Sequence, residues 1–423
     1  MHMKKKVLLI APGGLPVPAV RGGAVQNLVE HLIAQSERHR DFQLFVITPL
    51  DEQARKQALE QYPNTEFCWV RIPKVMEWLD LLAYHTVKLL FHKAKAISFK
   101  NNFKLLFYGY KTARYLQKND FDRVVIENNI RNFLALKLFG NWKKYAGRYY
   151  YHLHNIPRTS FGCKEIIQNC KDILCVSQYV VDSICDARNP IGPVDPGRVL
   201  VYKNCIDTAR FCPGRMEESR QLAWRKKLGL LPQEKIVLFA GRLSAEKGIL
   251  ETIRAFRKLD VPDVRLLVVG ADFYGLKTTS PFEEKLREEA KPIADRICFT
   301  GYIPYDRMPA IYQLADLAVL PSVWDEPAGL TILEAMASGL PVITTKAGGI
   351  PEYTNPQSAV LLERDDTLVD QLASWITRLL QDEEWNAALR KQAVKTAGEY
   401  NIQRYYEDFL RCLQLNEENY GKD

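Results

Sequence analysis

The feature of this sequence that most constrains its fold is a regular alternation of short apolar runs with longer segments of helical periodicity. The alternation runs through the first half of the chain and begins again after two turn-rich stretches, 189–197 and 211–214. It is typical of an open, mostly parallel sheet that helices cover on both faces. We therefore predict an α/β fold made of two Rossmann-like, doubly wound domains in tandem.

The periodicity also predicts where the elements lie. In the first half we expect strands at 7–11, 42–47, 67–72, 123–127, 148–152, 173–176 and 199–202, with helices at 24–35, 77–96, 103–118 and 180–186. In the second half we expect strands at 236–240, 265–269, 297–300, 317–320, 342–344 and 359–361, with helices at 248–259, 282–291, 329–338 and 367–381. We place the domain boundary after Lys203, which gives an N-terminal domain at 1–203 and a C-terminal domain at 204–402. The last segment, 403–423, begins with an aromatic helical pattern, and we expect it to pack back on the first domain.

Composition excludes several classes of protein. A chain of 423 residues, 47% hydrophobic and 26% charged, is long enough for two domains with separate cores. No apolar run reaches the roughly 18 residues of a membrane span, and the basic start lacks the apolar core of a signal peptide. The nine cysteines are odd in number and have no two-residue spacing, so we expect mostly buried free thiols. A cytoplasmic location follows as an expectation.

The net charge of +8 is unevenly distributed. Residues 1–203 hold 30 basic and 17 acidic side chains, a net charge of +13, whereas the remainder has a net charge of −5. Within the first part, 74–118 combines nine basic residues, two acidic ones and many apolar side chains, including Trp78, Leu81 and Leu82. Such a stretch suits either an anionic membrane surface or a pair of helices with one face on the sheet and a solvated basic face. No nucleic-acid-binding motif accompanies the basicity, so no nucleic-acid partner is expected.

One strand-to-helix turn in the second domain carries most of the candidate chemistry. Glu326 lies in the loop and Glu334 in the helix that follows, eight positions later. The free N–H groups of Gly329, Leu330 and Thr331 would begin that helix at the ligand-binding edge of the sheet, where they favour a phosphate. The alternative is that Thr331 and Glu334 form a capping box and that Glu326 is a solvated loop acid.

Three further segments carry candidate residues. Arg242 and Lys247 flank another strand-to-helix turn, and because cations there oppose the helix dipole, they favour an anionic ligand over simple surface charge. Gly22 and Gly23 open the first helix but lack the spacing of a dinucleotide fingerprint. The strand at 148–152 leads to His154, although a histidine at a strand end is more often structural.

Five motifs, in their order along the chain, resemble those of the retaining nucleotide-sugar glycosyltransferases of family 4. The motifs are Lys203-Asn204-Cys205-Ile206-Asp207 ahead of Phe211-Cys212-Pro213, Gly241-Arg242 with Lys247-Gly248, Gly301-Tyr302-Ile303-Pro304, the run 326–334, and Ala347-Gly348-Gly349-Ile350-Pro351-Glu352. The resemblance covers essentially the whole chain and is densest from 203 to 361. It implies the GT-B fold, in which the two domains face a central cleft.

The resemblance also implies roles for residues of the second domain. Arg242 and Lys247 would hold the diphosphate of a nucleoside-diphosphate sugar, with UDP the favoured nucleotide. Glu334 would bind the ribose hydroxyls and Glu326 the hydroxyls of the transferred sugar. Ile303 would contact the base.

The remaining implied roles concern backbone and the first domain. The backbone of Gly329–Thr331 would meet the phosphates, Gly22 and Gly23 would let the first domain approach the donor, and His154 would lie beside the reacting sugar. Three positions depart from the family pattern: Gln26 stands where Glu is common, Cys205 where Gly is common and Ala328 where Phe is common. The departure at Gln26 leaves its acceptor-side role open.

The implied reaction is transfer of the sugar to an acceptor hydroxyl with retention of anomeric configuration. Charge builds on the departing diphosphate, so Arg242, Lys247 and the helix N-terminus would stabilise it without a metal ion or other cofactor. No carboxylate is placed as a nucleophile, so we expect front-face attack in which the leaving phosphate oxygen takes the acceptor proton. The basic first domain suggests a saccharide or lipid-linked acceptor. Alternatives are a nucleotide-sugar epimerase, a phosphorylase on the same scaffold, and a catalytically silent nucleotide-sugar-binding subunit.

Overall fold

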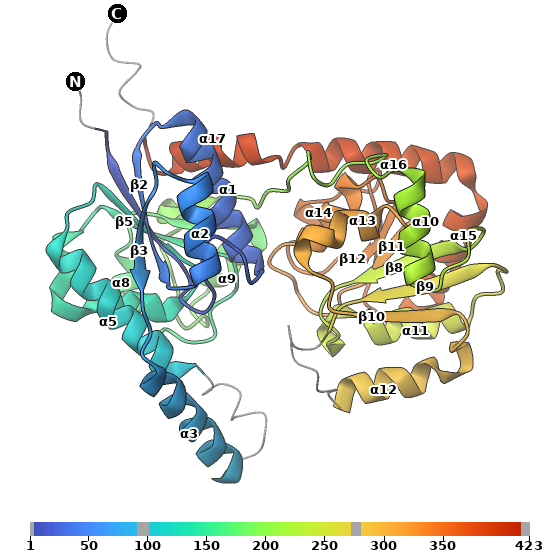
Figure 1. Cartoon of the computed structure of the whole chain (residues 1–423), viewed down its shortest axis with the longest axis horizontal. Coiled ribbons are helices and arrows are strands. Elements are labelled where there is room, and N and C mark those ends of the chain that lie inside the picture. Colours follow the sequence, from blue (N-terminus) through green and yellow to red (C-terminus); the bar gives the residue numbers. More distant parts are fainter. Residues whose placement is uncertain (1–3, 91–100, 272–280, 416–423) are drawn as a thin grey trace, which may run out of the picture. The chain divides into compact units, whose positions relative to one another are not determined.

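The structure is a computed structural model of the chain, and it describes residues 4–90, 101–271 and 281–415, with the side chains of 87–90 excepted. The chain divides into two compact units. Unit 1 comprises Met1–Lys203 and Tyr405–Asp423, and unit 2 comprises Asn204–Arg404. Each unit is built on one parallel sheet (Figure 1).

Unit 1 is a doubly wound α/β domain. Its sheet has the strand order β3-β2-β1-β4-β5-β6-β7, and every pair of neighbours is parallel. The strands are β1 (Lys6–Ile10), β2 (Gln43–Pro49), β3 (Glu66–Val70), β4 (Arg123–Glu127), β5 (Tyr149–Leu153), β6 (Ile173–Cys175) and β7 (Val199–Val201). The helices are α1 (Ala24–His39), α2 (Glu52–Gln61), α3 (Lys74–Leu90), α5 (Asn102–Lys118), α6 (Leu134–Lys137), α7 (Asn141–Lys144), α8 (Lys164–Gln168) and α9 (Gln178–Cys185), with 3-10 turns η1 (Ile130–Phe133), η2 (Leu138–Gly140) and η3 (Pro196–Arg198).

Unit 2 repeats this architecture with its own sheet, in the order β10-β9-β8-β11-β12-β13. The strands are β8 (Lys235–Ala240), β9 (Val264–Val269), β10 (Ile297–Gly301), β11 (Leu317–Leu320), β12 (Val342–Thr345) and β13 (Val360–Leu362). The helices are α10 (Glu218–Lys227), α11 (Ile249–Arg257), α12 (Pro281–Ala290), α13 (Met308–Tyr312), α14 (Leu330–Ala337), α15 (Leu368–Gln381) and α16 (Glu383–Gly398), with η4 (Ala245–Lys247), η5 (Lys291–Ile293), η6 (Tyr305–Arg307) and η7 (Ile350–Glu352).

Burial on both faces explains why β8 of unit 2 is apolar from Ile236 to Ala240. Leu238 of β8 packs into one cluster with residues of α13, α14 and α16, whereas its neighbour Val237 packs into a second cluster with α11, α12 and α15. Successive side chains of a strand point to opposite faces, so a sheet covered on both sides needs apolar residues at every position. The prediction of two doubly wound domains is confirmed.

The C-terminal helix α17 (Ile402–Cys412) packs on unit 1 through its aromatic side chains. The ring of Phe409 lies 6.2 Å from those of Phe42 and Tyr202, and Tyr405 stacks on Tyr202 at 4.6 Å. The hydroxyl of Tyr406 donates a hydrogen bond to Asp41 at 3.0 Å. The helix therefore completes the core of unit 1 although it follows unit 2 in the sequence.

Several helices were missed by periodicity because they bury almost nothing. Helix α2 buries only Ala54 and Ala58, and α10 has no buried residue. Trp224 of α10 packs partly against the core of unit 2, and both helices also make polar contacts. Asp51, for example, accepts hydrogen bonds from the first N–H groups of α2. The predicted helix at 77–96 begins earlier, at Lys74, and its end lies outside the described residues.

All nine cysteines are free; four are buried and five are partly buried. In the described ranges no helix is both long and apolar enough to span a bilayer.

We predict that Phe409→Ala destabilises unit 1 by about 3–5 kcal/mol, because the truncation leaves a cavity among fully packed aromatic rings. Urea unfolding followed by tryptophan fluorescence measures this change. The control Arg404→Ala, at an exposed position of the same helix, should change the free energy of unfolding by less than about 0.5 kcal/mol. Equal effects of the two variants would contradict the packing role of α17.

Candidate active site

Both sheets have a topological switch point, where the strand order reverses. In unit 2 it lies between β8 and β11, and in unit 1 between β1 and β4. Ligands of doubly wound domains bind beyond the carboxyl ends of the strands at such a point. The predicted site residues of each unit lie at this edge, in the loops and turns that follow the strands.

In unit 2 the structure brings together two predicted residues from different strand-to-helix turns. The Lys247 ammonium, at the end of η4, lies 2.6 Å from Oε1 of Glu326 in the loop before α14. The hydroxyl of Ser322 lies 2.8 Å from the same oxygen. The Glu326 side chain is only 15% exposed, so it is not the solvated loop acid that the sequence left open. A ligand at this edge would meet one cation and one anion at a fixed separation.

Local backbone geometry explains why the two turns approach so closely. Gly248 has a φ of +71°, and a Cβ atom there would lie 1.9 Å from the carbonyl oxygen of Pro321. Only glycine fits this crossing. Two hydrogen bonds tie the loop that carries Glu326 to the turn after β12. The backbone carbonyl of Glu326 accepts the Gly349 N–H at 2.7 Å, and Oδ1 of Asp325 accepts the Gly348 N–H at 3.1 Å. The loop is therefore held on both sides.

Helix α14 begins at this edge without a side-chain cap. Gly329 is its N-cap residue and makes no side-chain hydrogen bond, so the capping box of Thr331 and Glu334 is wrong. The first N–H groups of the helix, at Leu330 and Thr331, have no acceptor within the helix. These N–H groups give the N-terminus of α14 a partial positive charge. An anion such as a phosphate can bind at such a helix end.

Glu334 is a buried carboxylate one turn into α14. Its Oε2 accepts a hydrogen bond from Tyr312 at 2.8 Å, and the Tyr305 hydroxyl also bonds to it. Burial raises the pKa of Glu334 to about 7, although both tyrosines and the charge of Arg210 act in the opposite direction. When ionised, the Glu334 carboxylate can accept hydrogen bonds from both hydroxyls of a diol. Because its pKa is about 7, only half of the molecules carry the ionised form near neutral pH.

The remaining residues of this edge are less constrained. Arg242 follows β8 and is half exposed, with its guanidinium 3.7 Å from Glu246, a separation at which a surface pair contributes little. Ile303 lies in the turn after β10 and packs partly against the core. Both positions are compatible with contact to a ligand.

In unit 1 the glycine pair begins α1 directly beside a buried amide. Gly22 and Gly23 have φ values of +74° and +109°, which side chains rarely adopt. Gly23 is the N-cap residue of α1, and a Cβ atom there would lie 2.1 Å from Oε1 of Gln26. Gln26 itself is buried. The side chain of Gln26 therefore occupies the space that a side chain at Gly23 would need.

Sequence reasoning singled out His154 but missed Glu127. The buried carboxylate of Glu127, at the end of β4, lies 2.9 Å from Nδ1 of His152 and 3.3 Å from Nε2 of His154. Burial by itself would raise the pKa of Glu127, but the two histidines lower it to about 2. Glu127 is the register partner of His152, a pairing that the sequence pattern alone does not give.

Two arrangements bear on metal binding. Within the described residues, Glu127, His152 and His154 are the one group of three whose possible ligand atoms lie within 4.8 Å of one another. The expectation that the chain has no Asp-x-Asp motif is wrong, because residues 120–122 are such a triplet. Asp122 accepts a hydrogen bond from the Lys6 N–H at the opposite, amino-terminal edge of the sheet, so the triplet does not face the switch point.

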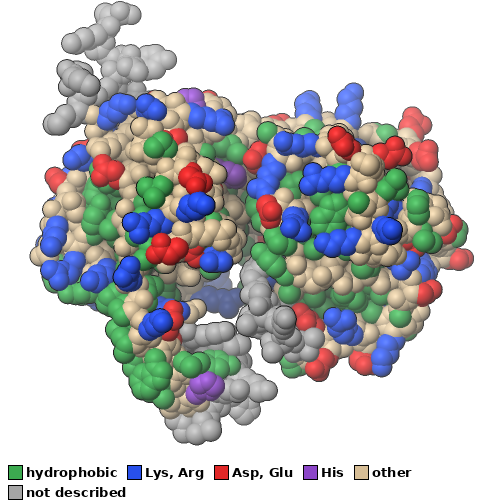
Figure 2. All heavy atoms as spheres, viewed as in Figure 1, with side chains coloured by type: hydrophobic (Ala, Val, Ile, Leu, Met, Phe, Trp, Pro, Cys, Tyr) green, Lys and Arg blue, Asp and Glu red, His purple; other side chains and the backbone are tan. Residues whose placement is uncertain are grey.

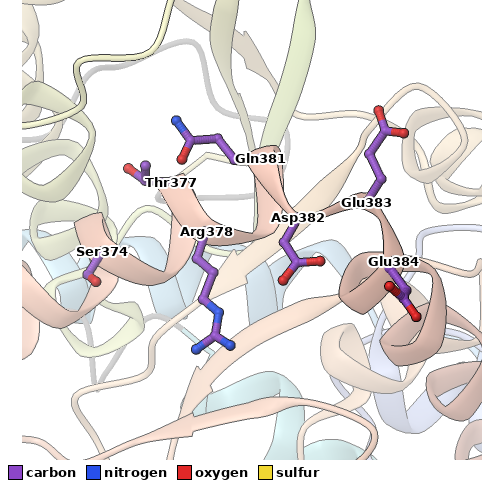
Figure 3. A pocket seen from close by; sticks show the side chains of 7 residues that line it. All are labelled: Ser374, Thr377, Arg378, Gln381, Asp382, Glu383 and Glu384. Atoms are coloured by element: carbon purple, nitrogen blue, oxygen red, sulfur yellow. The ribbon is translucent and has the colours of Figure 1, made fainter.

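A surface depression of about 600 Å³ lies where α15 meets α16 (Figure 3). Its lining is polar and consists of Ser374, Thr377, Arg378, Gln381, Asp382, Glu383 and Glu384. None of these is a predicted site residue, and the depression is formed by helices away from the loops that follow β8 and β11. We assign it no role.

The sequence is similar to known glycosyltransferases. Residues 220–396 match the family Glycosyl transferases group 1. The chain is 26% identical over 395 residues to the putative glycosyltransferase YtcC of Bacillus subtilis, covering 92% of this chain and 87% of that protein. It is 28% identical over 266 residues to lipopolysaccharide 1,2-N-acetylglucosaminetransferase of Salmonella typhimurium, covering 62% of this chain and 66% of that protein.

Solved structures share the fold. A glycosyltransferase from Rickettsia africae superposes with a TM-score of 0.72 at 18% identity, covering 99% of this chain and all of that one. Anabaena Alr3699/HepE, solved in complex with UDP, gives a TM-score of 0.67 at 20% identity, covering 97% and 99%. Likenesses at this identity concern the fold alone. The chain therefore has the GT-B fold, and its residues 220–396 match a glycosyl transferases group 1 domain.

Proposed function

We propose that the chain moves a sugar from a nucleoside-diphosphate sugar, with UDP as the favoured nucleotide, to an acceptor hydroxyl with retention of anomeric configuration. The observation that supports this most is the ion pair of Lys247 and Glu326 at the carboxyl edge of β8 and β11. The ammonium of Lys247 would bind a phosphate, and the neighbouring carboxylate of Glu326 would accept hydrogen bonds from sugar hydroxyls. The UDP complex of the Anabaena protein supports the choice of nucleotide.

In the proposed mechanism, positive groups stabilise the departing diphosphate. The Lys247 ammonium has three donors, so it can keep its bond to Glu326 while it donates to a phosphate oxygen. Arg242 and the N-terminus of α14 add positive potential on the same edge. Charge on the diphosphate grows as the glycosidic bond breaks, and these groups interact with it most strongly in the transition state.

The other contacts position the donor. Glu334 would accept hydrogen bonds from both ribose hydroxyls, Ile303 would contact the base, and the backbone of Gly329–Thr331 would meet the phosphates. In unit 1, Gly22 and Gly23 would let the backbone approach the donor, and His154 would position the transferred sugar. The leaving phosphate oxygen would take the proton of the acceptor hydroxyl.

We further propose that the acceptor is a saccharide or lipid-linked molecule of cell-surface polysaccharide or glycolipid synthesis, which the name of the Salmonella relative supports. Helix α3 offers a surface for such an acceptor at a membrane. Figure 2 shows hydrophobic side chains gathered over this helix, where Val75, Trp78, Leu81 and Leu82 are each half or more exposed. An apolar exposed face favours a bilayer over the solvated basic face that the sequence left as the alternative.

The charges around α3 fit an anionic surface. Its acidic residues are already engaged, because Asp80 accepts the N–H groups of Phe103 and Lys104 at the start of α5, and Glu77 pairs with the Lys104 ammonium at 2.9 Å. The basic residues Lys88, Lys93, Lys95 and Lys100 of the same stretch have side chains outside the described part of the chain. A peripheral position on an anionic membrane is therefore our proposal for the location.

A donor panel tests the proposed function. UDP-, GDP- and ADP-sugars are offered to the wild-type chain with excess chelator, and stabilisation, hydrolysis and transfer are measured. A bound donor at 100 times its dissociation constant should stabilise the chain by about 2.7 kcal/mol. We expect a UDP-sugar to give both stabilisation and turnover in chelator. Activity that is lost in chelator and restored by magnesium or manganese would refute metal independence, whereas tight binding without turnover would favour the silent-subunit alternative.

We predict that Arg242→Ala and Lys247→Ala each lower kcat about a hundredfold and raise the KM for the donor much less, because both cations act on charge that develops in the transition state. Steady-state kinetics with the active donor separates the two constants. Arg254→Ala, which removes an arginine of α11 that pairs with Glu289 of α12, is the matched control and should leave both constants unchanged. A rise in KM at unchanged kcat would mean that the two cations serve only ground-state binding.

We predict that Glu334→Gln weakens UDP binding about tenfold, because a charged acceptor of the ribose hydroxyls is lost. Since burial raises the pKa of Glu334 to about 7, the ionised acceptor is present above that pH and is lost below it. The affinity of the wild type for UDP, relative to that of Glu334→Gln, should therefore fall as the pH is lowered from 8 to 6. Calorimetric titration measures both trends, and a pH-independent ratio would remove Glu334 from the ribose site.

We predict that the double variant Trp78→Ser with Leu82→Ser weakens binding to anionic vesicles about a hundredfold, because it removes two large side chains that would enter the bilayer. Sedimentation with phosphatidylglycerol vesicles at low salt measures it. Leu59→Ser with Leu222→Ser removes exposed apolar residues of α2 and α10 as a control. A wild-type chain that ignores the vesicles would make a soluble acceptor the better proposal.

A further inference from the structure

Ser322 is a buried serine that lies just after β11 and faces the carboxylate of Glu326. The residue is 4% exposed, and its hydroxyl oxygen lies 2.8 Å from Oε1 of Glu326. The ammonium of Lys247 lies 2.6 Å from the same oxygen. Two side chains of the protein therefore meet one oxygen of this carboxylate.

The hydroxyl of Ser322 has a single hydrogen, and three acceptors lie within its reach. Besides Glu326, these are the backbone carbonyl oxygens of Glu246 at 3.0 Å and Trp324 at 3.1 Å. The carboxylate is the nearest acceptor, and because it is charged it forms the strongest bond. The carbonyl of Glu246 also accepts the N–H of Val323 at 3.0 Å. The hydrogen of Ser322 is therefore assigned to the bond with Oε1.

The backbone around Ser322 is fixed between two other segments of unit 2. Its N–H donates a hydrogen bond to the carbonyl of Leu320 at 3.0 Å, and its carbonyl accepts one from the hydroxyl of Thr345 at the end of β12. The preceding residue, Pro321, lies against Gly248, where a Cβ atom would be 1.9 Å from the proline carbonyl oxygen. Because the backbone is held on both sides, the serine hydroxyl is a donor in a fixed place.

The two oxygens of the Glu326 carboxylate are consequently not equivalent. Oε1 meets Lys247 and Ser322, whereas no group among the described residues donates a hydrogen bond to Oε2. The carboxylate is not sealed from solvent, because 15% of the side chain is exposed at this edge of the sheet. A carboxylate oxygen accepts hydrogen bonds and a sugar hydroxyl donates them. Oε2 is therefore the atom that can accept hydroxyls of a ligand.

We propose that Ser322 is a positioning residue of the donor site. Together with Lys247 it holds Oε1 of Glu326, so that Oε2 accepts hydroxyls of the transferred sugar. This inference rests on the proposed function. Lys247 is shared with the diphosphate, whereas the hydrogen of Ser322 serves Glu326 alone. Ser322 acts through Glu326 and does not contact the donor itself.

Ser322→Ala tests the proposal, because it removes the hydroxyl and leaves both charges in place. We expect kcat/KM for the UDP-sugar that is active in the donor panel to fall about tenfold, the scale of one lost hydrogen bond to a charged group. The affinity for UDP, measured by calorimetric titration, should stay unchanged, because UDP lacks the sugar that Glu326 would bind. Equal losses for UDP and for the UDP-sugar would overturn the proposal, since Ser322 would then only support the fold of this edge.

Ser338→Ala is the matched control. It removes a second buried serine hydroxyl of unit 2, at the other end of α14. Neither kcat/KM for the UDP-sugar nor the affinity for UDP should change.

A double-mutant cycle tests whether Ser322 acts through Glu326. In the Glu326→Ala background, Ser322→Ala should lower kcat/KM less than about twofold, because its partner is gone. Independent, multiplying effects of the two substitutions would contradict the positioning role.

A second measurement does not depend on activity. The free energies of unfolding of the wild type, Ser322→Ala, Glu326→Ala and the double variant, obtained from urea titrations, should be non-additive, because the two side chains are in contact. If the wild type transfers no sugar but the unfolding energies show this coupling, the proposed function fails and the contact of Ser322 with Glu326 stands. Additive unfolding energies would refute the contact and the proposal with it.

Discussion

Parallel strands end side by side, and this constraint brings together the candidate functional groups of both units. In unit 2 it sets the turn after β8 against the loop after β11, so that Lys247 meets Glu326 across 79 residues of sequence. In unit 1 it sets Glu127 beside His152 and His154. No local motif could hold these pairs. The sheets do so because their central strands, such as β4 and β11, are buried on both faces, and that burial fixes their register.

The two buried carboxylates show how partners decide the effect of burial. Among the described residues, the side chains that donate hydrogen bonds to Glu334 are the neutral hydroxyls of Tyr312 and Tyr305, and burial raises the pKa of Glu334 to about 7. Glu127 is equally buried, but its histidines overcome the effect of burial and lower its pKa to about 2. The first carboxylate is therefore suited to a ligand that brings its own hydroxyl donors, and the second to a permanent role within the protein. Position in the fold alone would not have distinguished them.

Much of the fold could be predicted from the sequence, because strands buried on both faces are continuous apolar runs. The strands at 123–127 and 317–320 were predicted with the bounds that the structure has. Helices that bury little, such as α2 and α10, were missed because they leave no periodic apolar pattern. The candidate residues of unit 2 lie in motifs that are continuous along the chain, which made them visible. Glu127 was missed because its significance depends on pairing with a strand more than twenty residues away, and single-sequence patterns do not give register.

The central claim is that the carboxyl edge of the unit 2 sheet binds a nucleoside diphosphate through Glu334, Lys247 and the start of α14. A crystal structure of the chain with UDP tests it most directly. The account predicts the ribose hydroxyls on the Glu334 carboxylate, the diphosphate within hydrogen-bond distance of Lys247 and the Thr331 N–H, and the base against Ile303. UDP bound elsewhere, or bound at this edge with Glu334 facing only Tyr312 and Tyr305, would contradict it.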